Sequence, residues 1–166
     1  MALSFARMET PVGALLLFAA DGALCGLGFE DQSAGLKKQL NRRFGGQVVE
    51  EDADPAGAIS RLTAYFSGDL EAIDAIPVDP GGTPFQREVW SALRRVPAGR
   101  TIAYSELARL SGHAGAVRAV GLANAKNPIA IVVPCHRVIG ADGSLTGYGG
   151  GLERKAWLLR HEHVLL

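Results

Sequence analysis

The first 30 residues alternate short apolar runs with polar turn residues. Residues 4–10 (SFARMET), 13–21 (GALLLFAAD) and 23–30 (ALCGLGFE) each have the length of a β-strand. Asp21-Gly22 separates the last two runs, and an Asp-Gly pair between apolar segments is a strong signal for a β-hairpin. The pattern therefore predicts a small antiparallel sheet at the start of the chain.

The apolar spacing then takes on the period of a helix. Residues 33–44 are predicted to be helical, with Ser33 as the N-cap and Gly45-Gly46 as the stop. Residues 47–51 (QVVEE) are predicted to return to a strand.

Residues 54–68 form a second predicted helix. Pro55 suits the first turn of this helix, because proline lacks the N–H that a helix start leaves unused. Its apolar face would consist of Leu62, Tyr65 and Phe66. Sheet and helices together predict a small α/β domain in this half of the chain.

A stretch rich in Pro and Gly at residues 76–84 (IPVDPGGTP) predicts a boundary between two domains, residues 1–80 and 81–166. Thr83 and Pro84 suit the N-cap and the first residue of a new helix. The apolar face of that helix would consist of Phe85, Val89, Trp90 and Leu93.

Two short helices around a glycine-containing turn are predicted next. Residues 96–104 form a turn and a short extended piece, Ser105 is the expected cap of a helix over 106–110, and residues 115–124 form a second helix. This is the helix-turn-helix pattern, although any small helical hairpin looks similar. The predicted fold class is α+β, with a small N-terminal domain built on an antiparallel sheet and a mainly helical C-terminal domain.

Charge is distributed unevenly along the chain of 166 residues, which carries 17 Lys and Arg and 17 Asp and Glu. Residues 1–83 hold 6 basic against 12 acidic residues, and residues 84–166 hold 11 basic against 5 acidic residues. Such asymmetry suggests that the second half meets a polyanion such as nucleic acid. Because the excess is modest, two solvated surfaces of different sign are the alternative.

The two cysteines, Cys25 and Cys135, lie far apart in the sequence. They form no CxxC pair and no disulfide framework, which favours a reducing compartment. The first residues lack the basic region and apolar core of a secretory signal, and the apolar runs are too short to span a membrane. The expected location is therefore the cytoplasm.

Cys135 follows the apolar run at residues 129–134 (IAIVVP) and precedes His136 and Arg137. We expect a buried strand that Pro134 ends, with Cys135 held at that end. A neighbouring base or cation promotes the thiolate that makes a cysteine nucleophilic. The carboxylates of this half that could orient the base are Glu88, Glu106, Asp142, Glu153 and Glu162. From these residues alone, a small buried hydrophobic side chain is the alternative interpretation of Cys135.

The stretch NPIAIVVPCHRVIG is similar to the active-site signature of the O6-alkylguanine-DNA alkyltransferases, also called methylated-DNA–protein-cysteine methyltransferases. Three further stretches resemble this family in the family's order: GTPFQREVWSALRRVPAGRTIAYSELA, AVRAVGLANAKNP and GYGGGLERKAWLLRHE. The resemblance covers residues 81–163, whereas residues 1–80 match the family only in general layout.

The resemblance implies a DNA repair protein that moves the alkyl group of O6-alkylguanine in DNA irreversibly onto its own Cys135, with O4-alkylthymine as an open second substrate. It implies a single-turnover reaction without a cofactor, since nothing in the sequence suggests a group that would remove the alkyl group again. The implied partner is double-stranded DNA, bound through the minor groove by a monomer that flips the damaged base out of the stack.

The resemblance also assigns catalytic roles to five residues. Cys135 would attack the alkyl carbon, His136 would deprotonate it through a water molecule, and Glu162 would orient His136. Asn127 would hold the loop that carries the cysteine. Tyr104 would donate its phenol proton towards the guanine ring and press on the flanking phosphate.

Other implied roles concern DNA and the base. Arg118 would fill the space left by the flipped guanine, and Ala119 and Gly121 would let their helix approach the duplex closely. The full set of implied DNA-binding residues is Arg118, Ala119, Gly121, Tyr104 and Lys126. The implied pocket residues are Tyr148, which packs on the base, Gly149, whose N–H meets O6, Gly150, which leaves room for the adduct, and Val138.

A metal site is not expected. Residues 1–83 contain one Cys and no His, so the zinc site that some family members carry in the N-terminal domain cannot be assembled there. Two functions of other classes remain as alternatives. A sensor that binds alkylated guanine without transfer would need no activated thiol, and a thiol hydrolase would leave the helix-turn-helix and Arg118 unexplained.

Overall fold

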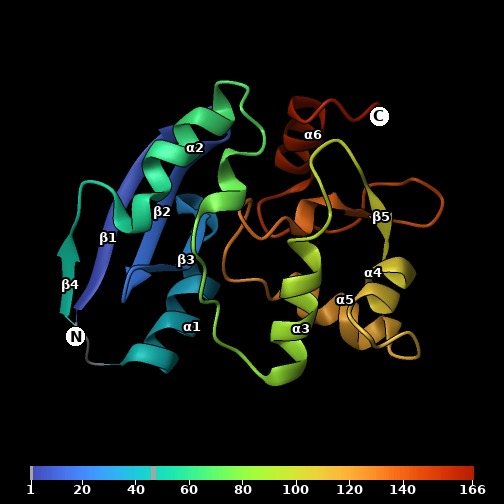
Figure 1. Cartoon of the computed structure of the whole chain (residues 1–166), viewed down its shortest axis with the longest axis horizontal. Coiled ribbons are helices and arrows are strands. Elements are labelled where there is room, and N and C mark those ends of the chain that lie inside the picture. Colours follow the sequence, from blue (N-terminus) through green and yellow to red (C-terminus); the bar gives the residue numbers. More distant parts are fainter. Residues whose placement is uncertain (1, 46–47) are drawn as a thin grey trace. The chain divides into compact units, whose positions relative to one another are not determined.

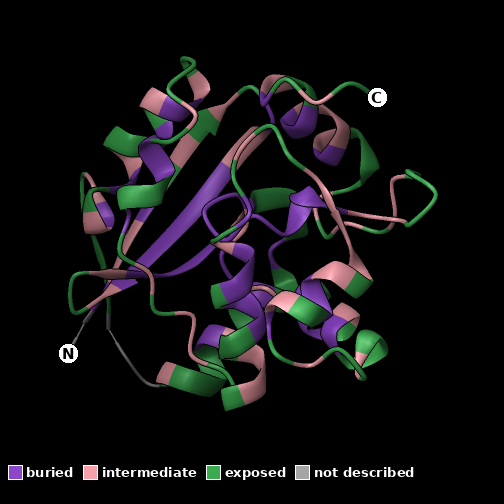
Figure 2. Cartoon of the chain, turned by 45° about the vertical axis from the view of Figure 1, so that its right-hand side comes forward, coloured by how far each residue is buried: buried purple, intermediate pink, exposed green. Residues whose placement is uncertain are grey.

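The computed structural model describes residues 2–45 and 48–166, and the chain divides into two compact units, Met1–Gly81 and Gly82–Leu166. Each unit has its own buried residues, and the helices are buried on one side and exposed on the other (Figure 2). None of the helices in the described ranges combines the length and the apolar character needed to cross a membrane.

The first unit is built on a four-stranded sheet with the order β3-β2-β1-β4 (Figure 1). The strands span Ala2–Thr10 (β1), Gly13–Ala20 (β2), Ala23–Phe29 (β3) and Val48–Glu51 (β4). The first three strands pair antiparallel, as predicted, and β4 adds a parallel edge beside β1. Asp21 and Gly22 have φ of +52° and +78°, the left-handed conformation that a tight hairpin turn requires.

The central strand β2 is buried on both faces of the sheet. Leu15 and Leu17 face one side and Leu16 and Phe18 face the other, and each is less than a tenth exposed. Helix α1, Ala34–Phe44, covers the second of these faces. The core cluster on that side consists of Leu3, Leu16, Phe18, Cys25, Leu36 and Leu40.

Helix α1 begins without the predicted side-chain cap. Ser33 occupies the N-cap position, but its hydroxyl donates to the carbonyl of Glu30 at 2.9 Å. The backbone of Ser33 is already close to helical, so its oxygen does not reach the free N–H groups of the first turn. The helix ends at the predicted Gly45. Gly46 and Gln47, the rest of the predicted stop and the start of the predicted strand, lie outside the described residues.

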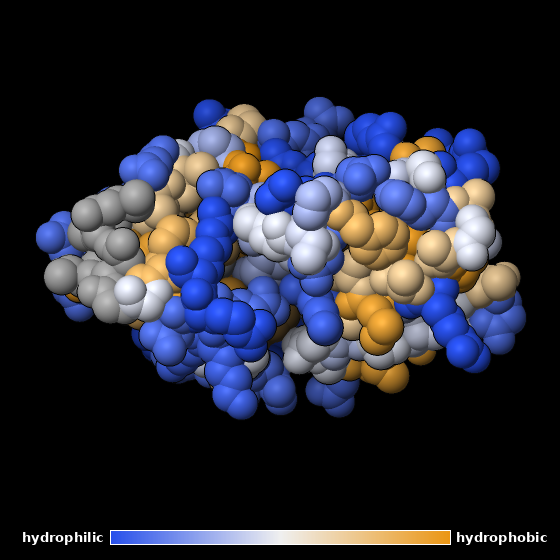
Figure 3. All heavy atoms as spheres, turned by 90° about the horizontal axis from the view of Figure 1, so that it is seen from below, coloured by the Kyte–Doolittle hydropathy of each residue, from blue (hydrophilic) through white to orange (hydrophobic). Residues whose placement is uncertain are grey.

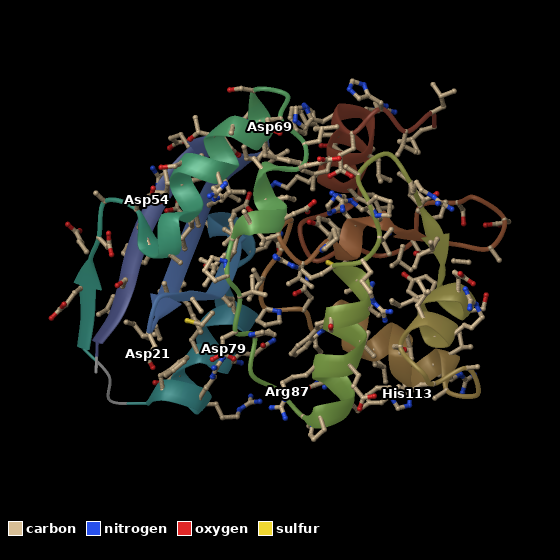
Figure 4. The ribbon with its side chains drawn as sticks, in the orientation of Figure 1. Asp21, Asp54, Asp69, Asp79, Arg87 and His113 are labelled. Atoms are coloured by element: carbon tan, nitrogen blue, oxygen red, sulfur yellow. The ribbon has the colours of Figure 1, made fainter. Side chains whose placement is uncertain are left out.

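The second predicted helix begins later than expected. Pro55–Gly57 forms a separate 3₁₀ turn, η2, and helix α2 spans Ala58–Phe66. Pro55 is not in the first turn of α2, because Ala56 has a φ of +56°, which an α-helix does not contain. Asp54 precedes this turn (Figure 4) and caps α2, since its Oδ1 accepts the N–H of the second helical residue at 2.6 Å. Two further 3₁₀ turns are η1, Glu30–Gln32, and η3, Ala72–Ala75.

The second unit is mainly helical. Its helices are α3 (Pro84–Leu93), α4 (Tyr104–Leu110), α5 (Val117–Ala125) and α6 (Leu152–His161), and the 3₁₀ turn η4 spans Cys135–Arg137. Strands β5 (Ile102–Ala103) and β6 (Val138–Ile139) form a small parallel pair. Thr83 caps α3 as predicted, because its hydroxyl accepts the N–H of Gln86 at 3.1 Å. In return, the side-chain oxygen of Gln86 accepts the N–H of Thr83 at 3.0 Å.

Helices α4 and α5 pack against each other and against α3, with His113 in the turn between them (Figure 4). Ser105 is not the cap of α4. The extended backbone that precedes the helix ends at Ala103, so Ser105 lies within the first turn. Helix α5 begins two residues later than predicted, because Ala116 has a non-helical backbone.

Candidate active site

The segment that carries Cys135 is a series of turns and not the predicted strand. Val133 donates its N–H back to the carbonyl of Ile129 at 3.0 Å. Ile131 has a φ of +69°, which lies outside the range of a β-strand. The prediction of a strand over residues 129–133 is therefore wrong, because a short apolar run looks the same in sequence whether it forms a strand or another buried segment.

Asn127 holds this buried turn with both ends of its amide. Nδ2 donates to the carbonyl of Val133 at 2.7 Å, and Oδ1 accepts the N–H of Ile129 at 3.0 Å. A non-glycine residue in the left-handed region, such as Ile131, costs on the order of 1–3 kcal/mol. The two bonds from Asn127 thus help to keep a strained backbone in place directly before the cysteine.

Cys135 is the first residue of η4 and is 9% exposed. Burial raises the pKa of its thiol above the usual value, whereas a hydrogen bond from the Asn127 side chain and the positive charge of Lys155 act in the opposite direction. Because burial prevails, Cys135 stays protonated at neutral pH until a base removes its proton.

His136 and Glu162 are both fully buried, and His136 Nε2 lies 2.8 Å from Glu162 Oε2. Burial alone would raise the pKa of Glu162, but the hydrogen bonds from His136 and Arg137 outweigh it and hold this pKa well below its usual value. The carboxylate can then only accept, so Nε2 of His136 carries the proton that it donates.

The second ring nitrogen of His136 is free to accept a proton. Nδ1 is buried and has no hydrogen-bond partner within the described part of the chain. Burial lowers the pKa of the ring, and the hydrogen bond to Glu162 offsets this only in part. His136 is therefore neutral at pH 7, with its lone pair on Nδ1.

Arg137 has a role that the sequence reasoning missed. It was expected as a cation beside the thiol, but its Nε and Nη2 donate to Glu162 at 2.8 and 3.0 Å. Its Nη1 donates to the carbonyl of Val96 at 2.6 Å, and the residue is 2% exposed. The guanidinium thus keeps the carboxylate ionised and oriented. The signal for this role was a charged residue directly after Cys-His within a buried run.

Lys155 on α6 is the second residue that the sequence reasoning missed. It is fully buried, and its Nζ donates to the carbonyls of Val138 at 2.6 Å and Thr146 at 3.1 Å. Burial lowers its pKa, which negative charge on Cys135 would raise. Helical spacing offered a signal, because Lys155 lies on the same face of α6 as two leucines, and Glu162, the residue that ends the helix, continues that spacing.

Tyr104 begins α4, and its ring lies against α5. A Cβ built at Gly121 would be 3.7 Å from the ring, an ordinary van der Waals distance. The phenol oxygen lies 2.7 Å from Oγ1 of Thr146, in the loop before α6. The structure therefore links Tyr104 to a loop residue to which the sequence assigned no role.

The four predicted pocket residues lie in or next to the same loop. Val138 is buried in β6, directly after η4. Tyr148 is half-buried, and burial of its hydroxyl raises the pKa of the phenol well above the usual value. Gly149 is exposed and Gly150 is half-buried.

Among the predicted DNA-binding residues, helix α5 exposes Arg118 and Ala119, whereas Gly121 is half-buried against Tyr104. Arg118, Leu122 and Lys126 follow one another at the i, i+4 spacing of a single helix face, and Ala119 beside them is exposed too. Leu122 is 65% exposed. Apolar patches lie among hydrophilic residues on the half of the surface that holds α3, α4 and α5 (Figure 3).

No group of three His, Cys, Asp or Glu side chains in residues 2–45 and 48–166 is arranged to hold a metal ion. The chemistry available at the site is that of a thiol, a neutral imidazole, a carboxylate and a phenol. These are the groups of a nucleophile with its general base, the base's orienting partner and a proton donor.

Two family models match the chain. The DNA-binding domain of 6-O-methylguanine DNA methyltransferase matches residues 84–164, and the ribonuclease-like domain of the same protein matches residues 3–80. The chain belongs to the 6-O-methylguanine DNA methyltransferase family. The predicted family, its DNA-repair function and its methyltransferase activity are thereby confirmed.

Curated relatives match this methyltransferase over nearly its whole length. The methylated-DNA–protein-cysteine methyltransferase of Shigella flexneri is 45% identical over 163 residues, covering 96% of this chain and 95% of the relative. The protein of the same name from Mycolicibacterium paratuberculosis is 48% identical over 160 residues, covering 96% and 92%.

Solved structures share the fold of the methyltransferase. The crystal structure of Mycobacterium tuberculosis OGT in complex with DNA is 41% identical with a TM-score of 0.81, covering 96% of this chain and 92% of the other. The O6-methylguanine-DNA methyltransferase of Pyrococcus kodakaraensis is 26% identical with a TM-score of 0.68, covering 98% and 99%. The predicted α+β fold class is confirmed.

Proposed function

We propose that the protein repairs O6-alkylguanine in DNA by moving the alkyl group onto Sγ of its own Cys135. The observation that carries the proposal is the arrangement around His136, which presents an unprotonated, unpartnered Nδ1 while an ionised Glu162 holds Nε2–H at 2.8 Å. A neutral base on the residue that follows a buried thiol, which does not ionise by itself, is what nucleophilic transfer needs.

The transfer is one displacement. His136 Nδ1 takes the thiol proton through a water molecule, Sγ bonds to the alkyl carbon, and the bond from that carbon to O6 breaks with its electron pair on the guanine. Tyr104 gives its phenol proton to the ring, which makes guanine a better leaving group. Glu162, fixed by Arg137, stabilises the imidazolium that forms.

The product is a thioether, which is chemically stable. The protein therefore acts once, with no cofactor, and each molecule accepts one alkyl group. Asn127 keeps the turn before Cys135 in shape throughout. A reducing location such as the cytoplasm suits this chemistry, because the acceptor must be a free thiol.

Double-stranded DNA is the proposed partner, bound by a monomer. The exposed face of α5 enters the minor groove, where Ala119 and Gly121 allow close approach and Lys126 adds positive charge. Arg118 occupies the space of the flipped base, since guanine O6 does not reach a buried thiol from within the stack. The flipped base packs on Tyr148 between Gly149, Gly150 and Val138.

The two units have different roles in this proposal. The C-terminal domain, residues 81–166, contains every residue named for catalysis and DNA binding, together with the excess of basic residues. The N-terminal domain, residues 1–80, carries the sheet and an excess of acidic residues, and its role is structural.

A transfer assay tests the proposal. Purified protein is mixed with duplex DNA that carries one radiolabelled O6-methylguanine, and protein and DNA are separated under denaturing conditions. We expect label on the wild-type protein, saturating at one group per molecule, and none on Cys135→Ser. Label that stays on the DNA while the protein still binds it would instead identify a lesion sensor.

A further inference from the structure

The hydroxyl of Thr146 contacts a group that the proposed reaction uses, although the reaction as described gives it no role. Its Oγ1 lies 2.7 Å from the phenol oxygen of Tyr104, across 42 positions of sequence. Such a contact joins the loop before α6 to the first residue of α4. Both residues are half-buried, so the hydrogen bond is partly shielded from water.

The backbone of Thr146 is held in place by Lys155. Its carbonyl accepts from the fully buried Nζ of Lys155 at 3.1 Å. The same ammonium donates to the carbonyl of Val138 at 2.6 Å, directly after the turn that carries Cys135. Lys155 thus ties the loop to the nucleophile's segment, and this leaves the Thr146 hydroxyl in a defined place beside Tyr104.

We propose that Thr146 is a positioning residue for the transfer step, whose hydroxyl donates a hydrogen bond to the phenol oxygen of Tyr104. The proposal rests on the function given above, in which Tyr104 protonates the leaving guanine. With Thr146 donating, the phenol proton is free to point at the base. Without it, the phenol hydrogen has no fixed direction.

The bond gains strength as the reaction proceeds. When Sγ bonds to the alkyl carbon and the carbon–O6 bond breaks, the Tyr104 proton passes to a ring nitrogen and its oxygen becomes a phenolate. A hydrogen bond to an ionised acceptor is roughly twice as strong as one to a neutral acceptor. Thr146 therefore stabilises the transition state more than the bound substrate. Water returns a proton to the phenolate, and the imidazolium of His136 releases the thiol proton.

The test is the single-turnover rate of methyl transfer from duplex DNA containing O6-methylguanine. Thr146→Val keeps the shape of the side chain and removes the hydroxyl. We therefore expect a rate at least about tenfold lower, the loss typical of a hydrogen bond to a charged group. Thr146→Ser restores the hydroxyl and should recover most of the rate. Both variants should still accept one methyl group per molecule and bind undamaged duplex as the wild type does.

A double-mutant cycle separates positioning from damage to the loop. In a Tyr104→Phe background the hydroxyl has no partner, so adding Thr146→Val should slow transfer no further. Equal slowing in both backgrounds would overturn the proposal. Ser144→Ala is the matched control, because it removes a hydroxyl of the same loop that donates to Asp142 at 2.7 Å, and it should react at the wild-type rate.

Failure of the proposed function and failure of the role of Thr146 would give different results. If the wild-type protein accepts no methyl group at all, the proposed function is wrong. If the wild type reacts and Thr146→Val reacts as fast, the function stands and the role of Thr146 is refuted.

Discussion

Two buried thiols in one chain show what burial alone does and does not do. Cys25 on β3 is 1% exposed within the apolar cluster under α1, and its thiol donates to the carbonyl of Phe18 at 3.4 Å. Burial raises its pKa to about 11. Cys135 is buried too, and its pKa is also raised, but Asn127 and Lys155 counteract the effect and a neutral histidine follows it. Burial keeps both thiols protonated, and only the surroundings of Cys135 include the histidine and carboxylate that the proposed reaction needs.

One ion pair in the first unit is exposed, whereas one in the second unit is buried. Arg7 and Glu30 pair at 2.7 Å with side chains 47% and 44% exposed, as is usual for a protein surface. Arg137 and Glu162 pair at 2.8 Å with side chains 2% and 0% exposed. A buried pair adds little net stability, because removing both charges from water offsets their attraction. What it provides in the second unit is a fixed orientation for His136.

The sharpest test of the comparison between the thiols is their replacement. Cys135→Ser should abolish methyl acceptance, whereas Cys25→Ala should still accept one methyl group per molecule, because residues 1–83 contain no histidine that could serve Cys25 as a base. Counting label per protein molecule after incubation with excess methylated duplex measures both. Loss of methyl acceptance in a folded Cys25→Ala protein would contradict this difference between the two thiols.

Replacing the arginine of the buried ion pair should destabilise the protein much more than replacing the arginine of the exposed pair. Arg137→Met leaves Glu162 buried without its positively charged partner, and we expect a loss of about 3–5 kcal/mol in the free energy of unfolding. Arg7→Met should be indistinguishable from wild type, since water screens an exposed pair. Urea denaturation of the wild type and both variants measures the free energy of unfolding. Similar losses in the two variants would mean that burial does not determine how much an ion pair contributes to stability.

Lowering the pH should reduce the stability that Glu162 contributes much more than the stability that Glu30 contributes. Glu162 has a depressed pKa in the folded state, so its contribution is complete above about pH 4.3, the usual value for a glutamate, and is lost as the pH falls further. The stability difference between wild type and Glu162→Gln should therefore be largest at neutral pH and shrink below pH ~4.3. Denaturation curves at several pH values provide the measurement.

The matched control is Glu30→Gln. The pKa of Glu30 is also lowered, by its hydrogen bond to Arg7, so the sign of its effect is the same. Because this pair is exposed, its dependence on pH should be much weaker than that of Glu162. A dependence of equal size would show that the surface pair is as strongly coupled to folding as the buried one.

His136 should add a second dependence at higher pH. Its pKa is lowered in the folded protein, so the unfolded chain binds a proton below about pH 6.5 that the folded chain does not. Stability should fall as the pH drops below that value, and the transfer rate should fall where the ring becomes protonated. A transfer rate that already falls by half above pH 6.5 would contradict this role, because burial lowers the pKa of His136 below its usual value.

The sequence by itself determined the elements whose causes are local. The hairpin at Asp21-Gly22 and the N-cap at Thr83 follow from turn and cap chemistry over a few residues, and the structure has both. The motif around Cys135 also pointed to the family, since a resemblance depends on residue order alone. Local reasoning was wrong where another contact prevailed, as at Ser33, whose hydroxyl bonds backwards to Glu30.

Only the tertiary structure decided how the site is held together. The turn at Ile131 follows from the two hydrogen bonds that Asn127 makes across it, and an apolar run contains no sign of them. Arg137 reaches Glu162 from 25 positions away, and Tyr104 reaches Thr146 from 42. Residue types state which bonds a side chain is able to make, but distance in space selects the partner, and that distance exists only after the helices of the second unit have packed.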